Sequence, residues 1–236
     1  MRTIILTSRL DTHDTDEYGV RTPHNFGNEN GILDTLKSCI VKYDKLLYVA
    51  SDEHDYEITD MYANLVFESF SETLPFESYA ILDGRSTDPK RLIESADFII
   101  LGGGHVPTQN EYFDRLGLRD ILCNLDTPVL GISAGSMNMA KLVYCPPELP
   151  GEAIDKNFKL LLQGLGLTSI NVFPHYYDMI DFILDDLRMM EDIVVPPSFM
   201  LPVYILSDGD FIVQTGDKIT YHGNPKLLQF GMMKDL

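Results

Sequence analysis

One serine in this chain lies in a setting that could make it a nucleophile. Ser133 is the centre of Gly131-Ile132-Ser133-Ala134-Gly135, which follows an apolar run typical of a strand and precedes a helix-compatible run, 137–142. A nucleophile elbow needs this context, because a sharp strand-to-helix turn strains the serine and small neighbours avoid clashes. The helix start then favours negative charge near the hydroxyl. The pattern predicts a serine nucleophile; the alternative is an idle serine in a glycine-rich turn.

Three glycines could complete such a site. Gly102, Gly103 and Gly104 follow Leu101 at the end of another predicted strand. An acyl-transfer enzyme needs two backbone N–H donors that face the developing oxyanion. We expect one from Ala134 and the other from Gly103 or Gly104. A phosphate-binding loop is less consistent with the sequence, because neither a basic residue nor a fuller phosphate motif accompanies these glycines.

The general base should be one of six histidines, and position selects His175. In an open parallel sheet the active site lies outside the carboxyl ends of the strands. Gly103, Ser133 and His175 all follow predicted buried strands, so they should meet at one edge. A single histidine is more often structural than catalytic, and this coincidence of position is what favours His175.

A carboxylate should orient the imidazole and stabilise its charged form. Asp208 follows the next predicted strand and should share the same edge. Its competing interpretation is a turn residue before Gly209. Glu148 and Asp178 remain alternatives for the acid.

The elements that must position these residues are read from short apolar runs rich in Ile, Val, Leu and Phe. Such non-alternating runs are typical of strands that are buried on both faces. The predicted strands are 4–6, 46–50, 79–82, 98–101, 129–132, 170–173 and 203–206. Strands that alternate with helices predict an α/β fold with a doubly wound, mostly parallel sheet and helices on both faces.

Helix starts are predicted from capping residues. Ser51 is a candidate N-cap, Asp88-Pro89 begins a second helix, and Thr108 with Glu111 fits a capping box. A further helix is expected over about 178–190. At the C-terminus, 211–214 and 219–221 around Gly216-Asp217 predict a β-hairpin that is appended to the sheet.

Composition restricts the class of protein. The 236 residues form one apolar-rich chain without an obvious linker, so we expect a single α/β domain over 1–236. A net charge of −18 disfavours nucleic acid and anionic membranes as partners. No apolar run approaches the length of a membrane span or a signal sequence, which favours a cytoplasmic protein. The three scattered cysteines predict neither disulfides nor a zinc site.

The motifs together resemble the dipeptidase E (aspartyl dipeptidase) family of serine peptidases. The resemblance rests on Gly102–Gly104, the Gly131–Gly135 elbow, Pro174-His175-Tyr176 and Ser207-Asp208-Gly209, and covers roughly 97–223. It implies a fold like that of class I glutamine amidotransferases and cyanophycinase, and a reaction without cofactor or metal. Ser133 would be the nucleophile and His175 the base. Asp208 stands where the family has Glu.

A second departure concerns specificity. Family members that cleave Asp-X dipeptides carry an arginine in the segment after the histidine, where it can pair with a carboxylate. Here that segment is acidic, running from Asp178 to Asp186, with Arg188 beyond it. We therefore expect a small-peptide substrate without a preference for aspartyl dipeptides. The sequence leaves the oligomeric state open between a monomer and a homodimer.

Three other functions compete with a serine peptidase. An α/β-hydrolase esterase would use the triad order Ser, acid, His, with Asp208 as acid and His222 as base. A glutamine amidotransferase subunit would need cysteine where the chain has Ser133. A non-catalytic binding module on the same fold would keep the motifs without activity.

Overall fold

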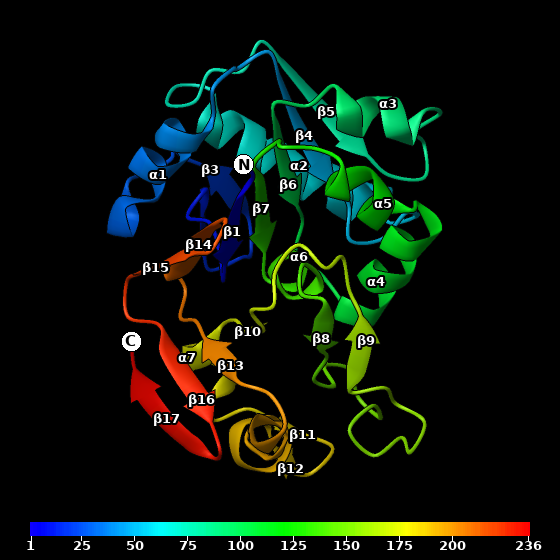
Figure 1. Ribbon diagram of the computed structural model, residues 1–236, viewed down its shortest axis with the longest axis vertical. Coiled ribbons are helices and arrows are strands. Elements are labelled where there is room, and N and C mark those ends of the chain that lie inside the picture. The colour runs from blue at the N-terminus through cyan, green and yellow to red at the C-terminus, as the bar shows by residue number, and fades with distance from the viewer.

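The computed structural model describes residues 1–236 and contains a seven-stranded central sheet (Figure 1). The strand order is β15-β14-β1-β7-β6-β4-β5. The strands are β1 (Thr3–Thr7), β4 (Lys45–Val49), β5 (Ser78–Leu82), β6 (Phe98–Leu101), β7 (Val129–Ile132), β14 (Phe211–Thr215) and β15 (Lys218–His222). The five strands β1, β7, β6, β4 and β5 are mutually parallel, whereas β14 pairs antiparallel with β1 and β15 pairs antiparallel with β14. The predicted α/β fold with a central, mostly parallel sheet is confirmed.

Each parallel strand contributes side chains to both faces of this sheet. In β4, Leu46 and Tyr48 join one buried cluster, and Leu47 and Val49 join the other, because successive side chains point in opposite directions. Residues of α1 (Ile32–Cys39) and α2 (Tyr56–Phe70) complete the first cluster. The second is completed by α3 (Pro89–Glu94), α4 (Val106–Arg115), α5 (Leu118–Cys123) and α6 (Ala134–Asn138). Burial on both sides explains the continuous apolar runs in the sequence.

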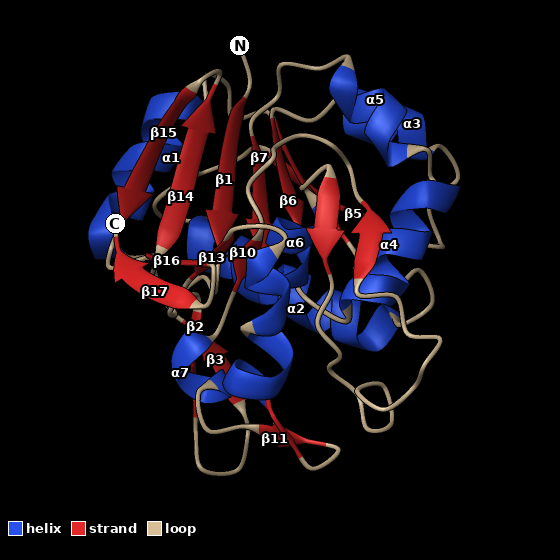
Figure 2. Cartoon of the chain, turned by 60° about the horizontal axis from the view of Figure 1, so that its bottom comes forward, coloured by secondary structure: helices blue, strands red, loops and turns tan.

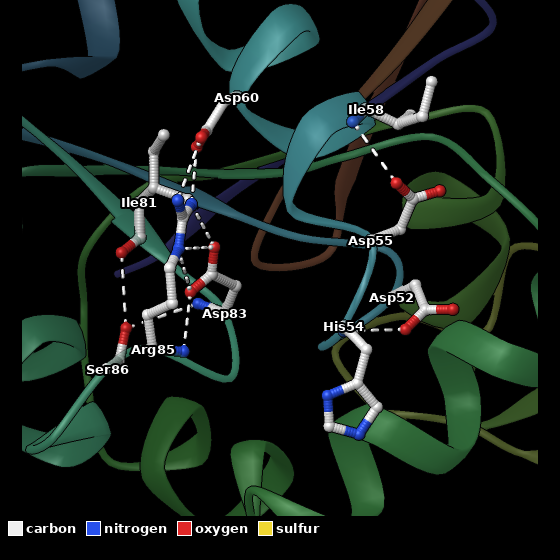
Figure 3. Close-up of polar contacts among 9 residues, drawn as sticks. All are labelled: Asp52, His54, Asp55, Ile58, Asp60, Ile81, Asp83, Arg85 and Ser86. Carbon is white, nitrogen blue, oxygen red and sulfur yellow. Dashed lines mark hydrogen bonds and ion pairs between the residues drawn. The ribbon is translucent and has the colours of Figure 1, made fainter.

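Only one of the three predicted helix starts is correct. Asp88 caps α3, and its carboxylate accepts a hydrogen bond from the Arg91 N–H. Ser51 does not cap α2, which begins at Tyr56 with Asp55 as N-cap. Between them, Asp52 accepts from the His54 N–H at 2.8 Å and forms a local turn (Figure 3).

The helix that follows the three glycines and the helix that follows the elbow also differ from expectation. The predicted capping box is wrong, because α4 begins at Val106 after His105 and therefore contains Thr108. The helix after the elbow, α6, begins at Ala134 and ends at Asn138, short of the predicted 142. Both helices nevertheless start directly beside the residues that were expected to form the site.

Two of the predicted strands belong to a different sheet. β10 (Val172–Phe173) and β13 (Val203–Ile205) pair in parallel, and β16 (Lys226–Gln229) and β17 (Met232–Asp235) extend them in the order β10-β13-β16-β17. Figures 1 and 2 show this second sheet beyond the carboxyl ends of β1 and β7. It has its own buried cluster, in which Phe173 and Val203 pack with Tyr144. An apolar run indicates that a strand is buried but does not identify the strand with which it pairs. The sequence therefore could not show that these strands belong to two sheets.

The helix expected over 178–190 is absent. The chain instead forms α7 (Tyr176–Met179), a small hairpin of β11 (Ile183–Leu184) and β12 (Leu187–Arg188), and a π-helix over Met189–Val194. Asp185 and Asp186, both with positive φ, make the two-residue turn of that hairpin. Two adjacent residues in this conformation are incompatible with a continuing helix.

The remaining strands are short. β2 (His13–Thr15) pairs with β3 (Arg21–Pro23), and β8 (Leu142–Tyr144) pairs with β9 (Leu161–Gln163). None of the helices combines the length and the apolar character that crossing a bilayer requires.

Candidate active site

Ser133 lies at the tip of a strained turn between β7 and α6. Its backbone has φ 51° and ψ −114°, a conformation that non-glycine residues rarely adopt. A Cβ on Gly135 would lie 2.2 Å from the Leu101 carbonyl oxygen, so the start of α6 packs directly against the end of β6. The Ser133 N–H also donates to the Thr7 carbonyl at 3.1 Å. Three neighbouring strand ends therefore fix the elbow.

The structure brings Ser133, His175 and Asp208 into one hydrogen-bonded chain. His175 Nε2 lies 3.0 Å from Ser133 Oγ, and His175 Nδ1 lies 2.8 Å from Asp208 Oδ1. A carboxylate only accepts hydrogen bonds, so this partner assigns the ring proton to Nδ1. Nε2 is then free to accept the proton of the Ser133 hydroxyl. This is the protonation state that a general base requires.

The surroundings of Asp208 favour its ionised form. Burial raises the pKa of this carboxyl, but hydrogen bonds from His175 and Ser8, together with the charge of Arg9, outweigh burial and bring the pKa below its ordinary value. Ser8 Oγ lies 2.8 Å from Asp208 Oδ1, and Arg9 Nη1 lies 3.8 Å from Oδ2. The carboxylate is therefore charged where it contacts the imidazole.

Neither alternative acid makes this contact. The Asp178 N–H donates to the His175 carbonyl, and the Asp178 carboxylate lies within 4.8 Å of the relevant ring and Asp208 atoms without a hydrogen bond to the ring. Glu148 instead neighbours Cys145 and Glu152, and burial followed by the Glu152 charge raises its pKa to about 7.

The alternative base, His222, lies in a different environment. Its ring stacks on Phe211 at 4.2 Å, and its two nitrogens contact the Asn30 carbonyl and the Thr220 hydroxyl. Its neighbours are thus the hairpin β14–β15 and the short 3-10 helix, Glu29–Gly31, before α1. The esterase arrangement that needs His222 beside Ser133 is not the one observed.

The three residues expected to supply oxyanion donors, Ala134, Gly103 and Gly104, do not all lie beside Ser133. Ala134 is buried and is the first residue of α6, directly after Ser133. A Cβ built on Gly103 would lie 3.5 Å from the Ser133 Cβ, so this glycine adjoins Ser133. Gly104 instead faces Ser51, whose hydroxyl would lie 2.4 Å from an added Cβ. The contacts therefore favour Gly103 over Gly104 as the second donor.

Most arginines are already paired with protein groups. Arg188 forms a bidentate ion pair with Asp192, with both nitrogen–oxygen distances at 2.9 Å. Arg85 pairs with Asp60 and Asp83 near the start of α2 (Figure 3). Arg9 lies beside Asp208, and its side chain is 48% exposed.

Sequence reasoning missed three positioning groups: Ser8, Ser136 and Asp210. Ser136 Oγ lies within 2.8 Å of both the Thr7 carbonyl and the Gly131 carbonyl, which ties α6 to β1. Asp210 accepts from the N–H groups of Ser207 and Asn224 and so fixes the turn that carries Asp208. The rule that selected His175 could have found Ser8, because Ser8 also directly follows a parallel strand, β1.

One set of side chains could also hold a metal ion. Ligand atoms of His175, Asp178 and Asp208 lie within 4.8 Å of one another. Both ring nitrogens of His175 are already engaged, one by Ser133 and one by Asp208. A metal on His175 would replace one of those bonds, so the present geometry fits proton transfer better than metal ligation.

Comparison with protein-family models shows the family. The model of peptidase family S51 matches residues 21–222, which include Ser133, His175 and Asp208. Among solved structures, the crystal structure of a "Putative Peptidase E Protein" from Listeria monocytogenes EGD-e has a TM-score of 0.58 and 14% identity, and the match covers 100% of this chain and 99% of the Listeria chain. That likeness shows a shared fold. No curated protein matches the sequence. Because the family model covers most of the chain, the protein belongs to peptidase family S51, the dipeptidase E family, and is a serine peptidase.

Proposed function

We propose that the protein hydrolyses short peptides through an acyl-enzyme formed on Ser133. The observation that carries the proposal is the chain of hydrogen bonds from Ser133 Oγ through both nitrogens of His175 to Asp208. In this mechanism, Oγ attacks the scissile carbonyl carbon while its proton passes to His175 Nε2. Collapse of the tetrahedral intermediate breaks the peptide C–N bond, and His175 returns the proton to the leaving amine.

The second half of the reaction uses the same groups. A water molecule gives one proton to His175 Nε2 and its oxygen attacks the ester carbonyl carbon. The C–Oγ bond then breaks, and Ser133 recovers its proton from His175. In both halves Asp208 keeps the ring proton on Nδ1 and stabilises the imidazolium. The backbone N–H groups of Ala134 and Gly103 are the donors that we assign to the oxyanion.

The charges around the triad argue against a preference for aspartyl dipeptides. Asp178 lies beside His175 and Asp208, and Arg188 is already paired with Asp192. An acidic side chain of the substrate would approach carboxylates, and the nearby arginine, Arg9, already faces Asp208. We therefore propose a substrate class of short peptides with neutral or basic residues at the cleavage site.

The finer architecture forms part of the same proposal. We infer a doubly wound sheet of the class I glutamine amidotransferase type, with the hairpin β14–β15 as an addition at one end. The helices on both faces and the antiparallel pairing of β14 with β1 support this inference.

A fluorophosphonate probe tests the nucleophile. The wild-type protein should be labelled, and Ser133→Ala should not, because the probe phosphonylates an activated serine with loss of fluoride. Labelling that persists in Ser133→Ala would remove Ser133 from its role. A dipeptide and tripeptide library, screened with both proteins in parallel, then identifies the substrates that depend on Ser133.

A pair of histidine variants separates the peptidase from the esterase arrangement. His175→Ala should abolish labelling, whereas His222→Ala should label at close to the wild-type rate. The reverse result would favour the esterase. If the wild-type protein reacts with neither the probe nor any library peptide, the binding-module alternative gains support.

A further inference from the structure

Ser8 is a buried hydroxyl outside the predicted triad that contacts two of its members. It follows β1 and is fully buried. Its Oγ lies 2.8 Å from Asp208 Oδ1, and the His175 backbone N–H donates to the same Oγ at 2.8 Å. One oxygen atom therefore joins the loop that carries the base to the loop that carries the acid.

The chemistry of these contacts fixes the direction of each hydrogen bond. The backbone N–H of His175 can only donate, so Ser8 Oγ accepts from it. The single proton of the hydroxyl then points to Asp208, which is a pure acceptor when ionised. The separation of 3.5 Å between Ser8 Oγ and His175 Nδ1 is too long to compete. Asp208 Oδ1 thus accepts two hydrogen bonds, one from the Ser8 hydroxyl and one from the N–H of His175 Nδ1.

The position of Ser8 explains why such a group is needed. Ser133 belongs to the central sheet, whereas His175 and Asp208 follow β10 and β13 of the second sheet. At the end of β1, the Thr7 carbonyl accepts from the Ser133 N–H, and the next residue, Ser8, holds both other members. Two consecutive residues at the end of β1, Thr7 and Ser8, therefore hold Ser133 and its two partners in fixed positions relative to one another.

The backbone of His175 also needs support. It adopts the left-handed conformation, with φ 57° and ψ 38°. For a non-glycine residue this conformation is unfavourable, so it persists where surrounding contacts enforce it. The hydrogen bond from the His175 N–H to Ser8 is such a contact.

We propose that Ser8 is a positioning residue of the active site, which holds His175 and Asp208 in the geometry that activates Ser133. The proposal rests on the proposed function. The second donor on its Oδ1 restricts where the Asp208 carboxylate can lie. Ser8 acts through these two residues and not on the substrate.

The principal variant is Ser8→Ala, which removes the hydroxyl and leaves the backbone unchanged. We expect kcat for a Ser133-dependent peptide to fall about 10- to 100-fold, with KM within about twofold, since misplacement of a catalytic group slows the chemical step without altering binding. Ser8→Thr, which keeps the hydroxyl, should recover most of the activity. Ser198→Ala is the matched control, because Ser198 is also buried, donates to the Val195 carbonyl and accepts from the Gly231 N–H.

A spectroscopic measurement distinguishes positioning from general destabilisation. The proton on His175 Nδ1 should give a far-downfield NMR resonance in the wild-type protein. That resonance should shift or broaden in Ser8→Ala and remain unchanged in Ser198→Ala, even where both variants lose similar thermal stability.

The outcomes separate the two proposals. If Ser133→Ala hydrolyses the peptide as fast as wild type, the proposed function is wrong. If hydrolysis depends on Ser133 but Ser8→Ala keeps the wild-type kcat, the assignment of Ser8 is overturned. Should Ser8→Ala fail to fold, Ser8→Cys replaces it as a side chain of similar shape with weak hydrogen bonding. Ser8→Thr must then be at least about fivefold faster than Ser8→Cys, and equal rates overturn the assignment.

Discussion

The substitution Asp208→Asn tests the identity of the acid, and the structure sets the size of its effect. Asn keeps the shape of the side chain and removes the charge that stabilises the imidazolium. A hydrogen bond to a charged group contributes ~1.5–3 kcal/mol, and 1.4 kcal/mol is a factor of ten in rate. Loss of charge alone should therefore slow acylation by about 10- to 150-fold.

The orientation of the new amide decides whether the loss is greater. If the amide nitrogen faced His175, the ring would have to carry its proton on Nε2 and could not accept from Ser133, and losses of about 10⁴-fold are known for that tautomer in serine proteases. Here Oδ1 accepts from both Ser8 and His175, so the amide oxygen should occupy that site. The correct tautomer is then retained, and we expect a loss of about 100-fold.

The assay is the second-order rate of labelling by a fluorophosphonate, measured on folded protein as judged by circular dichroism. Asp178→Asn and Glu148→Gln are the controls, since neither side chain bonds to the His175 ring, and both should label within about threefold of wild type. A loss smaller than threefold in Asp208→Asn, with a large loss in either control, would refute Asp208 as the acid. A loss near 10⁴-fold would show that Ser8 does not hold the amide oxygen in place.

Two further predictions concern stability. Gly135→Ala places a methyl group 2.2 Å from the Leu101 carbonyl oxygen, and a backbone atom cannot easily move away. Urea denaturation should therefore show that the free energy of unfolding falls by about 2 kcal/mol or more. The control Gly27→Ala, which has no atom within 4 Å of the added methyl group, should change it by less than about 0.5 kcal/mol. Equal effects of the two substitutions would contradict the packing argument. Burial and the Glu152 charge raise the pKa of Glu148 from 4.5 to about 7, so the folded state holds this proton more tightly than the unfolded state. Protonated Glu148 therefore contributes roughly 3 kcal/mol to the free energy of unfolding below pH 4.5, and this contribution is lost as the pH rises through about 7. Glu148→Gln should flatten this part of the stability profile, and an unchanged slope between pH 5 and 7 would exclude Glu148 as its source.

The local signals in the sequence were reliable where one interaction dominates. The apolar runs at 4–6, 46–50, 79–82, 98–101 and 129–132 are all strands of the central sheet, because burial on both faces demands such runs. Asp88-Pro89 marks a helix start because the cap and the ring act within one turn.

Local signals failed where distant contacts decide the conformation. Ser51 faces Gly104 instead of capping α2, and the segment 178–190 is divided by the turn at Asp185-Asp186. The Asp185 carboxylate accepts from the N–H groups of Gly151 and Ala153, more than 30 residues away in the chain. No helical periodicity within 178–190 could report those partners.

The residue types and their places after strands were enough to single out Ser133 and His175 and to make Asp208 one candidate for the acid, because parallel strands bring their carboxyl ends to one edge of a sheet. That reasoning treated the strands as one sheet, whereas His175 and Asp208 follow β10 and β13 of a second sheet. The choice among Asp208, Asp178 and Glu148 required coordinates, since a hydrogen bond of 2.8 Å depends on the angles of two loops and not on their distance along the chain. The same holds for Ser8, whose hydroxyl acquires its two partners only when the second sheet lies beyond the end of β1.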